Sequence, residues 1–240
     1  MTELTNLKQI ALVTGASSGL GKAIALRLVE QNYHVVLASR NIEKLEIVKN
    51  EIENKSGKCT IIPTDVSLES SVQHLVTECD KLGFVGTVIN NSGLGLFSKI
   101  SNHSTEDWDQ MINVNLRGAF LISRGFIPAM QNRKQGTLVF VNSVAGKWGY
   151  PFSAGYVASK YGLRGLADSL RNELRSDHIK VTSVHPGAVD SPFWDNTKAN
   201  FPRHEMMQDD DVAKMVVQAI TLSGNAVNEE IVIRRVQGDF

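Results

Sequence analysis

The chain lacks the cysteine patterns that would assign it to a disulfide-rich or metal-binding class. Its 240 residues include two cysteines, Cys59 and Cys79, and neither belongs to a CxxC pair or to a His/Cys cluster. Such a chain offers no disulfide framework and no set of zinc ligands. We therefore interpret both cysteines as reduced packing residues and expect no metal site.

The chain also lacks long apolar runs and an excess of charge of one sign. No stretch reaches the ~18 apolar residues of a membrane span, and the start, MTELTNLKQ, has no apolar run typical of a signal peptide. Lys plus Arg and Asp plus Glu both total 25, which argues against a broad basic surface for nucleic acid. We expect a cytoplasmic protein that binds neither nucleic acid nor membrane.

Short apolar runs that alternate with longer helical patterns predict the fold class. Runs rich in Val, Ile and Thr predict strands at 10–15, 34–39, 59–63, 87–91, 137–143, 180–187 and 229–235. Helical patterns occupy 20–31, 41–55, 68–82, 105–132, 154–176 and 209–223. This order predicts a single-domain, Rossmann-like α/β protein with a doubly wound parallel sheet of about seven strands. Ligands of such sheets bind beyond the carboxyl ends of the strands.

A glycine-rich segment, TGASSGLG (14–21), lies between the first predicted strand and the first predicted helix. Gly15, Gly19 and Gly21 have the spacing GxxxGxG, which allows a tight turn and a close approach of backbone to a pyrophosphate at the helix N-terminus. A glycine-rich turn without a ligand is the alternative. The position directly after a strand and before a helix favours dinucleotide binding.

Arg40 indicates which dinucleotide is bound. NAD-binding chains usually carry an acidic residue at the end of the second strand, but this region reads LASRN (37–41) and has no acid. A guanidinium binds a 2′-phosphate that a carboxylate would repel, so we predict NADP(H). An ordinary surface role for Arg40 is the alternative, and Ser17, Ser18 and Asn41 are candidates for further hydrogen bonds.

The segment YVASK (156–160) places Tyr156 and Lys160 one helical turn apart, and Ser143 ends the preceding strand. A solvated helix face would show the same spacing. A carbonyl reduced by hydride needs a proton at oxygen, which a tyrosine donates if its pKa moves from ~10 toward neutrality. A nearby ammonium lowers that pKa, and a serine hydroxyl holds the substrate oxygen in line.

Together these motifs resemble those of the short-chain dehydrogenase/reductase (SDR) family, and the resemblance spans nearly the whole chain. The glycine segment resembles the family's TGxxxGxG loop, NNSG (90–93) its NNAG, and YVASK its YxxxK. Ser143 lies at the catalytic serine position, and Asn115 in NVNL (113–116) aligns with the catalytic asparagine. HPG (185–187) followed by Ser191 resembles the PGxxxT segment that contacts nicotinamide.

The resemblance implies a catalytic role for four residues. Tyr156 would be the general acid in reduction and the base in oxidation, and Lys160 would lower its pKa and hydrogen-bond the nicotinamide ribose. Ser143 would polarise the substrate carbonyl. Asn115 would hold a water that connects Lys160 to solvent for proton relay, whereas a helix-interior asparagine satisfied by a neighbouring carbonyl is the alternative for this residue taken alone.

The resemblance also extends the set of residues expected to bind NADP(H). Asp65 would hydrogen-bond the adenine amino group, and Asn91 would lie beside the adenosine ribose. Two residues depart from the family motifs: Ser92 replaces the alanine of NNAG, and Ser191 replaces the threonine of PGxxxT. We expect both positions to keep their contacts with the cofactor. The complete set is Gly15, Ser17, Ser18, Gly19, Leu20, Gly21, Arg40, Asn41, Asp65, Val66, Asn91, Ser92, Gly93, Tyr156, Lys160, Pro186, Gly187, Val189 and Ser191.

Two loops are expected to contact the substrate, one after Ser143 (144–155) and one after the sixth strand (188–208). Their aromatic content favours a hydrophobic or aromatic carbonyl compound or alcohol, although packing against the core or another subunit is an equal alternative for each ring. The second loop is long enough for a lid. The aromatic residues are Trp148, Tyr150, Phe152, Phe193, Trp194 and Phe201, and the substrate candidates among them are Trp148, Tyr150, Phe193 and Trp194.

We therefore expect one SDR domain over 1–240, with 1–143 mainly binding the dinucleotide, 144–208 forming the catalytic helix and substrate loops, and 209–240 adding a last helix and strand. The resemblance implies a homodimer or homotetramer through the helices that bear Asn115 and Tyr156. A dinucleotide-sensing regulator and a sugar-nucleotide epimerase or dehydratase are alternatives; the first usually loses the tyrosine or lysine, and the second needs a larger C-terminal part. The ending EEIVIRRVQGDF makes a 3-oxoacyl thioester reductase less favoured.

Overall fold

The computed structural model describes residues 9–195 and 202–238. Its main strands are β1 (Ile10–Thr14), β2 (His34–Ser39), β3 (Lys58–Pro63), β4 (Val85–Asn90), β5 (Gly136–Val141), β6 (Ile179–Pro186) and β9 (Glu230–Ile233). Within the described residues these seven strands form one parallel sheet in the order β3–β2–β1–β4–β5–β6–β9. The predicted doubly wound α/β class is confirmed.

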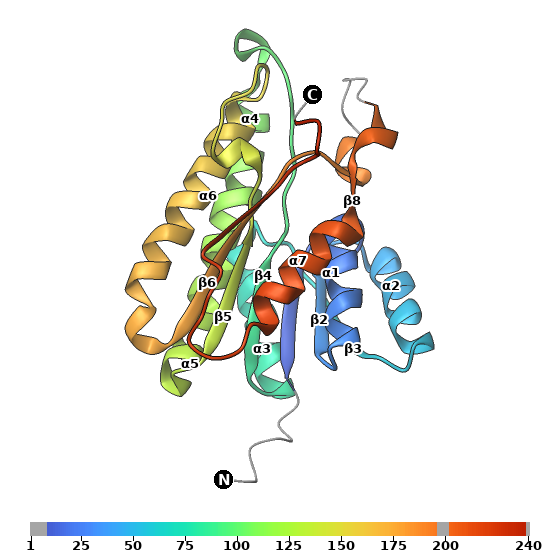
Figure 1. Cartoon of the computed structure of the whole chain (residues 1–240), viewed down its shortest axis with the longest axis vertical. Coiled ribbons are helices and arrows are strands. Elements are labelled where there is room, and N and C mark those ends of the chain that lie inside the picture. The colour runs from blue at the N-terminus through green and yellow to red at the C-terminus, as the bar shows by residue number, and fades with distance from the viewer. Residues whose placement is uncertain (1–8, 196–201, 239–240) are drawn as a thin grey trace.

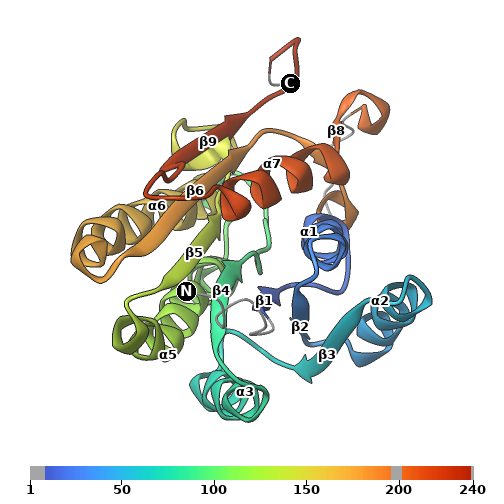
Figure 2. The ribbon, with the colours of Figure 1, turned by 60° about the horizontal axis from the view of Figure 1, so that its bottom comes forward.

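Helices cover both faces of the sheet (Figures 1 and 2). The helices are α1 (Gly19–Glu30), α2 (Ile42–Asn54), α3 (Glu69–Leu82), α4 (Thr105–Met111), α5 (Gly118–Arg133), α6 (Ala154–Glu173) and α7 (Asp209–Thr221). Helices α1, α2 and α7 lie on one face, and α3, α5 and α6 on the other. Every predicted helix is present, but a π-helical turn, η2 (Ile112–Arg117), separates α4 from α5 inside the predicted helix 105–132.

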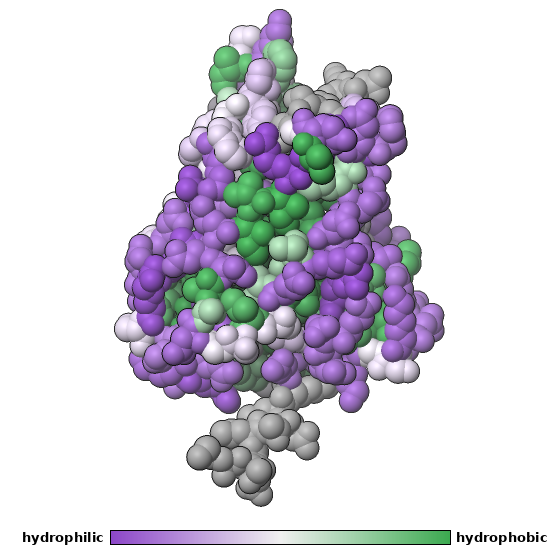
Figure 3. All heavy atoms as spheres, viewed as in Figure 1, coloured by the Kyte–Doolittle hydropathy of each residue, from purple (hydrophilic) through white to green (hydrophobic). Residues whose placement is uncertain are grey.

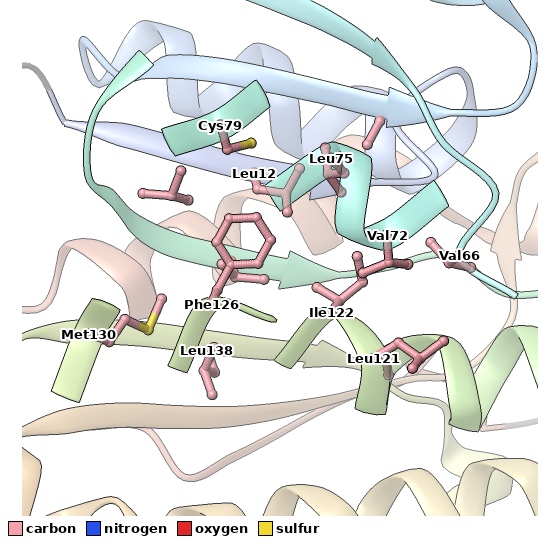
Figure 4. Close-up of a cluster of buried hydrophobic side chains, with 14 of the residues drawn as sticks. Leu12, Val66, Val72, Leu75, Cys79, Leu121, Ile122, Phe126, Met130 and Leu138 are labelled. Atoms are coloured by element: carbon pink, nitrogen blue, oxygen red, sulfur yellow. The ribbon is translucent and has the colours of Figure 1, made fainter. Parts of the chain in front are cut away.

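Two apolar clusters hold these layers together, because the central strands are apolar on both faces. Figure 4 shows the cluster under α3 and α5, where Phe126 and Ile122 of α5 meet Leu75 of α3 and Leu138 of β5. The second cluster joins α1, α2 and α7 to the opposite face, through residues such as Ile24, Leu45 and Val212. Truncating one such buried side chain to alanine costs about 2–5 kcal/mol.

The sheet topology places a crevice at one edge. Strand β1 pairs with β2 on one side and with β4 on the other, so the connections that leave these strands turn to opposite faces. The carboxyl ends of β1 and β4 therefore diverge and leave room for a ligand at that edge. In Figure 1 this edge is at the top of the molecule, where the loops after β4, β5 and β6 gather.

The segment after β6 contains more regular structure than the predicted loop 188–208. A short parallel pair, β7 (Val189–Asp190) with β8 (Met207–Gln208), closes its base. Single turns of 3₁₀ helix, η5 (Pro192–Trp194) and η6 (Arg203–Glu205), lie between them. Phe201, one of the aromatic residues noted in the sequence, lies outside the described residues.

The surface shows where apolar side chains remain exposed. Figure 3 shows a group of hydrophobic residues in the middle of the face that β9 and α7 cross in Figure 1, surrounded by hydrophilic residues. Val232 of β9 and Met215 of α7 are among the exposed apolar side chains. None of the described helices is both long enough and apolar enough to cross a membrane.

Candidate active site

The glycine segment forms a tight turn between β1 and α1. Gly15 and Gly19 have φ values of +67° and +54°, a conformation that favours glycine. At Gly21 a Cβ would lie 2.3 Å from the carbonyl oxygen of Gly15, so only glycine fits there. Ser18 precedes α1 without making a side-chain cap, and the first turn of α1 has no acidic residue. The N–H groups of this turn therefore remain available for an anion.

The residues that follow β4 hold this turn in place through hydrogen bonds. The Asn91 side-chain amide donates to the Thr14 carbonyl at 2.9 Å, and the Thr14 hydroxyl accepts from the backbone N–H groups of Asn91 and Ser92, both at 3.0 Å. Asn91 thus holds the glycine turn rather than projecting only toward a ribose. Gly93 follows, and a Cβ there would lie 3.6 Å from the Lys160 Nζ, so the same loop borders the lysine.

Arg40, just after the end of β2, has a positive charge that is available to a ligand. Arg40 is exposed and makes no hydrogen bond or ion pair with any other residue in the described ranges. Asn41 caps α2, because its side chain accepts from the Lys44 N–H at 2.8 Å. Ser17 and Ser39 are joined through their hydroxyls at 2.9 Å. Of the residues predicted to surround a 2′-phosphate, Arg40 is therefore the one with an uncommitted charged group.

Asp65 and Val66 lie after β3 on the same edge of the sheet. Asp65 Oδ1 accepts from the backbone N–H and the hydroxyl of Ser67, at 2.9 and 2.6 Å, which fixes the turn into α3. Val66 is buried and packs close to Gly118 at the start of α5. Asp65 is thus held in place at the edge where the predicted adenine contact would be made.

Ser143, Tyr156 and Lys160 meet at the junction of β5 and α6. The Ser143 side chain lies close enough to the Tyr156 hydroxyl to lower its pKa, and the Lys160 Nζ lies 5.7 Å from the centre of the Tyr156 ring. Lys160 is only 4% exposed and donates to the Val141 carbonyl at 3.0 Å. Asn142 ties the group together, since its side chain donates to the Lys160 carbonyl and accepts from the Ser143 N–H.

Burial shifts the two titratable groups in opposite directions. It raises the pKa of Tyr156 to about 12, against a smaller lowering by the Ser143 side chain. It lowers the pKa of Lys160 to about 8. The expected lowering of the Tyr156 pKa does not hold for the protein by itself, because removal of water from the phenolate is the dominant cause and Lys160 is not among the groups that shift this pKa.

Asn115 is buried in the π-helical turn, and both N–H groups of its side chain are used. Its Oδ1 accepts from the Leu94 N–H at 2.8 Å, and its Nδ2 donates to the Leu94 carbonyl and to Ser159 Oγ, both at 2.9 Å. Ser159 in turn donates to the Tyr156 carbonyl at 2.7 Å. The amide therefore links the β4 loop to α6, and the water relay through Asn115 stays a prediction. Turns of this kind are frequent at functional sites.

Two aromatic rings, those of Phe97 and Phe193, pack on Tyr156, and Trp194 packs on both of them. The Phe193 ring lies 5.6 Å from the Tyr156 ring and 5.2 Å from that of Trp194, centre to centre. Phe97, which the sequence interpretation did not include, lies 5.6 Å from Tyr156 and stacks on Trp194 at 6.0 Å and 13°. The signal for Phe97 was its place just beyond NNSG, at the carboxyl end of β4.

The other two substrate candidates lie elsewhere on the 144–155 loop. Trp148 is 44% exposed, and the guanidinium of Arg234 lies over its ring at 5.1 Å. No contact between Trp148 and the rings of the Tyr156 cluster is present in the described residues. Tyr150 is partly buried. The loop after β6, and not the loop after β5, therefore supplies most of the aromatic surface beside Tyr156.

The segment after β6 lies over the glycine turn. Gly187 donates its N–H to the Ile233 carbonyl at 2.8 Å, which ties the end of β6 to β9 beside Pro186. Val189 pairs with Met207 in the β7–β8 pair. A Cβ on Gly19 would lie 3.2 Å from Ser191 Cβ. Ser191 therefore stands against the first turn of α1.

Fold and site together define a Rossmann-like α/β protein with a Ser–Tyr–Lys group beside a dinucleotide-type glycine turn. The sequence matches the short chain dehydrogenase family over residues 9–201, and the chain belongs to that family. The sepiapterin reductase of Chlorobaculum tepidum is 33% identical over 98% of this chain and 99% of that protein. An uncharacterized oxidoreductase of Staphylococcus aureus (strain USA300) is 36% identical over 98% and 100%.

Solved structures with the same fold cover almost the whole chain. The alcohol dehydrogenase of Thermococcus sibiricus, complexed with 5-hydroxy-NADP, has a TM-score of 0.88 at 28% identity and covers 96% of this chain and 97% of its own. A metagenomic short-chain oxidoreductase in complex with NADP has a TM-score of 0.84 at 33% identity, with coverage of 95% and 97%. An actinorhodin polyketide ketoreductase variant with NADPH has a TM-score of 0.89 at 27% identity, with coverage of 97% and 98%.

Proposed function

We propose that this protein is an NADP(H)-dependent oxidoreductase that transfers a hydride between nicotinamide and a carbonyl or secondary alcohol. The observation that carries the proposal is the meeting of Ser143, Tyr156 and Lys160 beside the glycine turn. A proton donor, a hydroxyl to orient it and a cation are the groups that carbonyl reduction needs. The absence of an acid at the end of β2 and the free guanidinium of Arg40 support the phosphorylated cofactor.

The shape of the glycine turn fits a dinucleotide. The uncapped first turn of α1 would hold the pyrophosphate, Arg40 the 2′-phosphate, and Asp65 the adenine. Lys160 and Ser191 border the space left for the nicotinamide end. When bound, the cofactor supplies or accepts the hydride. The three similar solved structures carry NADP, NADPH or 5-hydroxy-NADP, which supports the same choice here.

Each of the three polar residues has a role in moving the proton. Tyr156 donates its phenolic proton to the carbonyl oxygen in reduction and removes it from the alcohol in oxidation. Ser143, whose side chain lies near the Tyr156 hydroxyl, orients the substrate oxygen toward Tyr156. Lys160 stabilises the phenolate that reduction leaves, and Asn115 orients α6 through Ser159 and the Tyr156 carbonyl.

The rings around Tyr156 favour an apolar, planar substrate. Phe97 and Phe193 pack against the Tyr156 ring, and Phe97 stacks on Trp194. Aromatic side chains prefer offset stacks or edge contacts with other rings. An aromatic or conjugated carbonyl therefore fits better than a small aliphatic one. The similarity to a protein named sepiapterin reductase supports a reduction reaction.

A dimer or tetramer is proposed through α4, α5 and α6. Trp108, Phe120 and Tyr161 expose large rings on these helices, and aromatic residues are enriched in the cores of protein interfaces. Light scattering of the purified protein tests the assembly by measuring its molecular mass in solution. A monomer at micromolar concentration would contradict it.

The reaction is tested by following NADPH and NADH oxidation against a panel of aromatic ketones and aldehydes, diketones, quinones, steroids and 3-oxoacyl thioesters. We expect turnover with NADPH and the highest kcat/KM for aromatic carbonyls. Tyr156→Phe should abolish turnover and change the Kd of NADPH by less than about 3-fold, because only the proton donor is lost. Intact turnover in Tyr156→Phe would contradict the assigned role.

A further inference from the structure

His185 is a buried histidine that the proposed reaction does not use. It belongs to the HPG sequence at the end of β6, and its side chain has no exposed surface. The ring lies between two groups. Its Nδ1 is 3.1 Å from the backbone carbonyl oxygen of Ser143, and its Nε2 is 3.5 Å from Glu230 Oε1.

The surroundings of the ring fix its tautomer. A carbonyl oxygen only accepts, so the Nδ1 next to Ser143 must carry the hydrogen. Nε2 makes no hydrogen bond within the described part of the chain, and burial lowers the pKa of the ring, which keeps it neutral. Glu230 is itself held by Lys147 at 2.6 Å and Arg164 at 2.9 Å, so the far side of the ring is closed by an ion-paired cluster.

Ser143 needs support from outside its own strand. The register of β5 with β6 ends at Val141 and Val184. One further bond, from the Asn142 N–H to the Val184 carbonyl at 2.7 Å, joins the strands just before the serine. The Ser143 carbonyl then accepts from the Gly146 N–H at 2.9 Å, within the turn that follows, and from His185. The bond from His185 is therefore the one that ties this carbonyl to the sheet.

We propose that His185 is a positioning residue for the reaction, which holds Ser143 through its backbone carbonyl so that the serine hydroxyl stays aligned with Tyr156. The proposal rests on the proposed function, because it needs Ser143 to act on the substrate oxygen. It extends that function to a residue on a different strand. Glu230, held by Lys147 and Arg164, stands on the opposite side of the ring from Ser143.

Three variants of His185 separate this role from simple packing. His185→Asn keeps an N–H donor near the Nδ1 position, His185→Gln moves its amide toward the Nε2 position, and His185→Leu removes both polar atoms. We expect His185→Leu and His185→Gln to lower kcat by about 10- to 100-fold, since small misplacements in a site have effects of that size. His185→Asn should recover most of that loss, and the Kd of NADPH should stay within about 2-fold in all three.

The same changes in a Ser143→Ala background test the pathway of the effect. If His185 acts through Ser143, His185→Leu lowers kcat by less than about 2-fold once the serine hydroxyl is gone, because the two sites are coupled. An equal loss in both backgrounds would overturn the proposal. A kcat of His185→Asn as low as that of a folded His185→Gln would also overturn it. If His185→Leu does not fold, the comparison of His185→Asn with His185→Gln decides the test.

The outcomes for the two proposals differ. Wild-type turnover that disappears in Tyr156→Phe and is unchanged in His185→Leu supports the reaction and overturns the positioning role alone. No turnover by the wild type across the carbonyl panel overturns the reaction and the positioning role with it. Circular dichroism and thermal unfolding of each variant show which of them are folded.

Discussion

Replacing Lys160 by methionine should stabilise the ligand-free protein while it abolishes turnover. Burial lowers the pKa of Lys160 from 10.5 to about 8, and each pKa unit corresponds to about 1.4 kcal/mol. At pH 7 the folded state therefore holds an ammonium at a cost of about 3 kcal/mol relative to the unfolded chain. Methionine has a similar length and no charge, so it removes this cost.

The gain is partly offset by one lost hydrogen bond. The Lys160 Nζ donates to the Val141 carbonyl at 3.0 Å, and a bond from a charged group contributes about 1.5–3 kcal/mol. We expect a net stabilisation of about 1 kcal/mol at pH 7, which raises the Tm by about 2–4 °C for a chain of this length.

The stability difference between the wild type and Lys160→Met should depend on pH. Because the folded pKa of Lys160 is depressed, the cost is complete below about pH 8 and disappears as the pH rises toward the unfolded value. At pH 10 the wild type should therefore be at least as stable as Lys160→Met.

Urea unfolding of the ligand-free protein at pH 7 and pH 10 measures the difference, with the exposed Lys44→Met as the control expected to change little. A Lys160→Met variant that is less stable at pH 7, or a difference independent of pH, would refute the reasoning.

Two other substitutions test the site. Arg40→Asp should weaken NADPH binding by at least about 10-fold and leave NADH binding nearly unchanged, because a carboxylate repels the 2′-phosphate; fluorescence titration measures both, and an equal loss for both cofactors would contradict the assignment. Phe193→Ala should admit water to Tyr156 and move its pKa from about 12 down toward ~10. The rise of alcohol oxidation with pH should then begin at lower pH than in the wild type, and an unshifted profile would show that Phe193 does not control the burial.

The strands and most helices could be predicted because local patterns determine them. Continuous apolar runs such as IALVT at β1 are typical of strands covered on both faces, and both faces are covered. The glycine turn was also predictable, since three glycines at fixed spacing have a direct steric reason. These features depend on residues close in sequence, where spacing alone carries the information.

The missed features depend on contacts between distant segments. Phe97 and Trp194 are almost a hundred positions apart in the sequence, so no local pattern indicates that their rings stack. The pairing of β7 with β8 joins the two ends of one loop. The side chain of Asn115 likewise finds its partners in Leu94 and Ser159, and only the folded chain shows that both its N–H groups are used in linking the β4 loop to α6.

The pKa shifts of Tyr156 and Lys160 have one cause. Burial favours the neutral form of any group, so it raises the pKa of the Tyr156 phenol and lowers that of the Lys160 amine. The proton on Tyr156 is then retained at neutral pH, while the lysine lies closer to losing its own. A carbonyl that is being reduced develops negative charge on oxygen, and this charge favours transfer of the retained proton at the moment of reaction. The phenolate that remains is the charge that Lys160 would stabilise. The same lack of water that makes both ionised groups costly in the empty site therefore strengthens their attraction once they form as a pair.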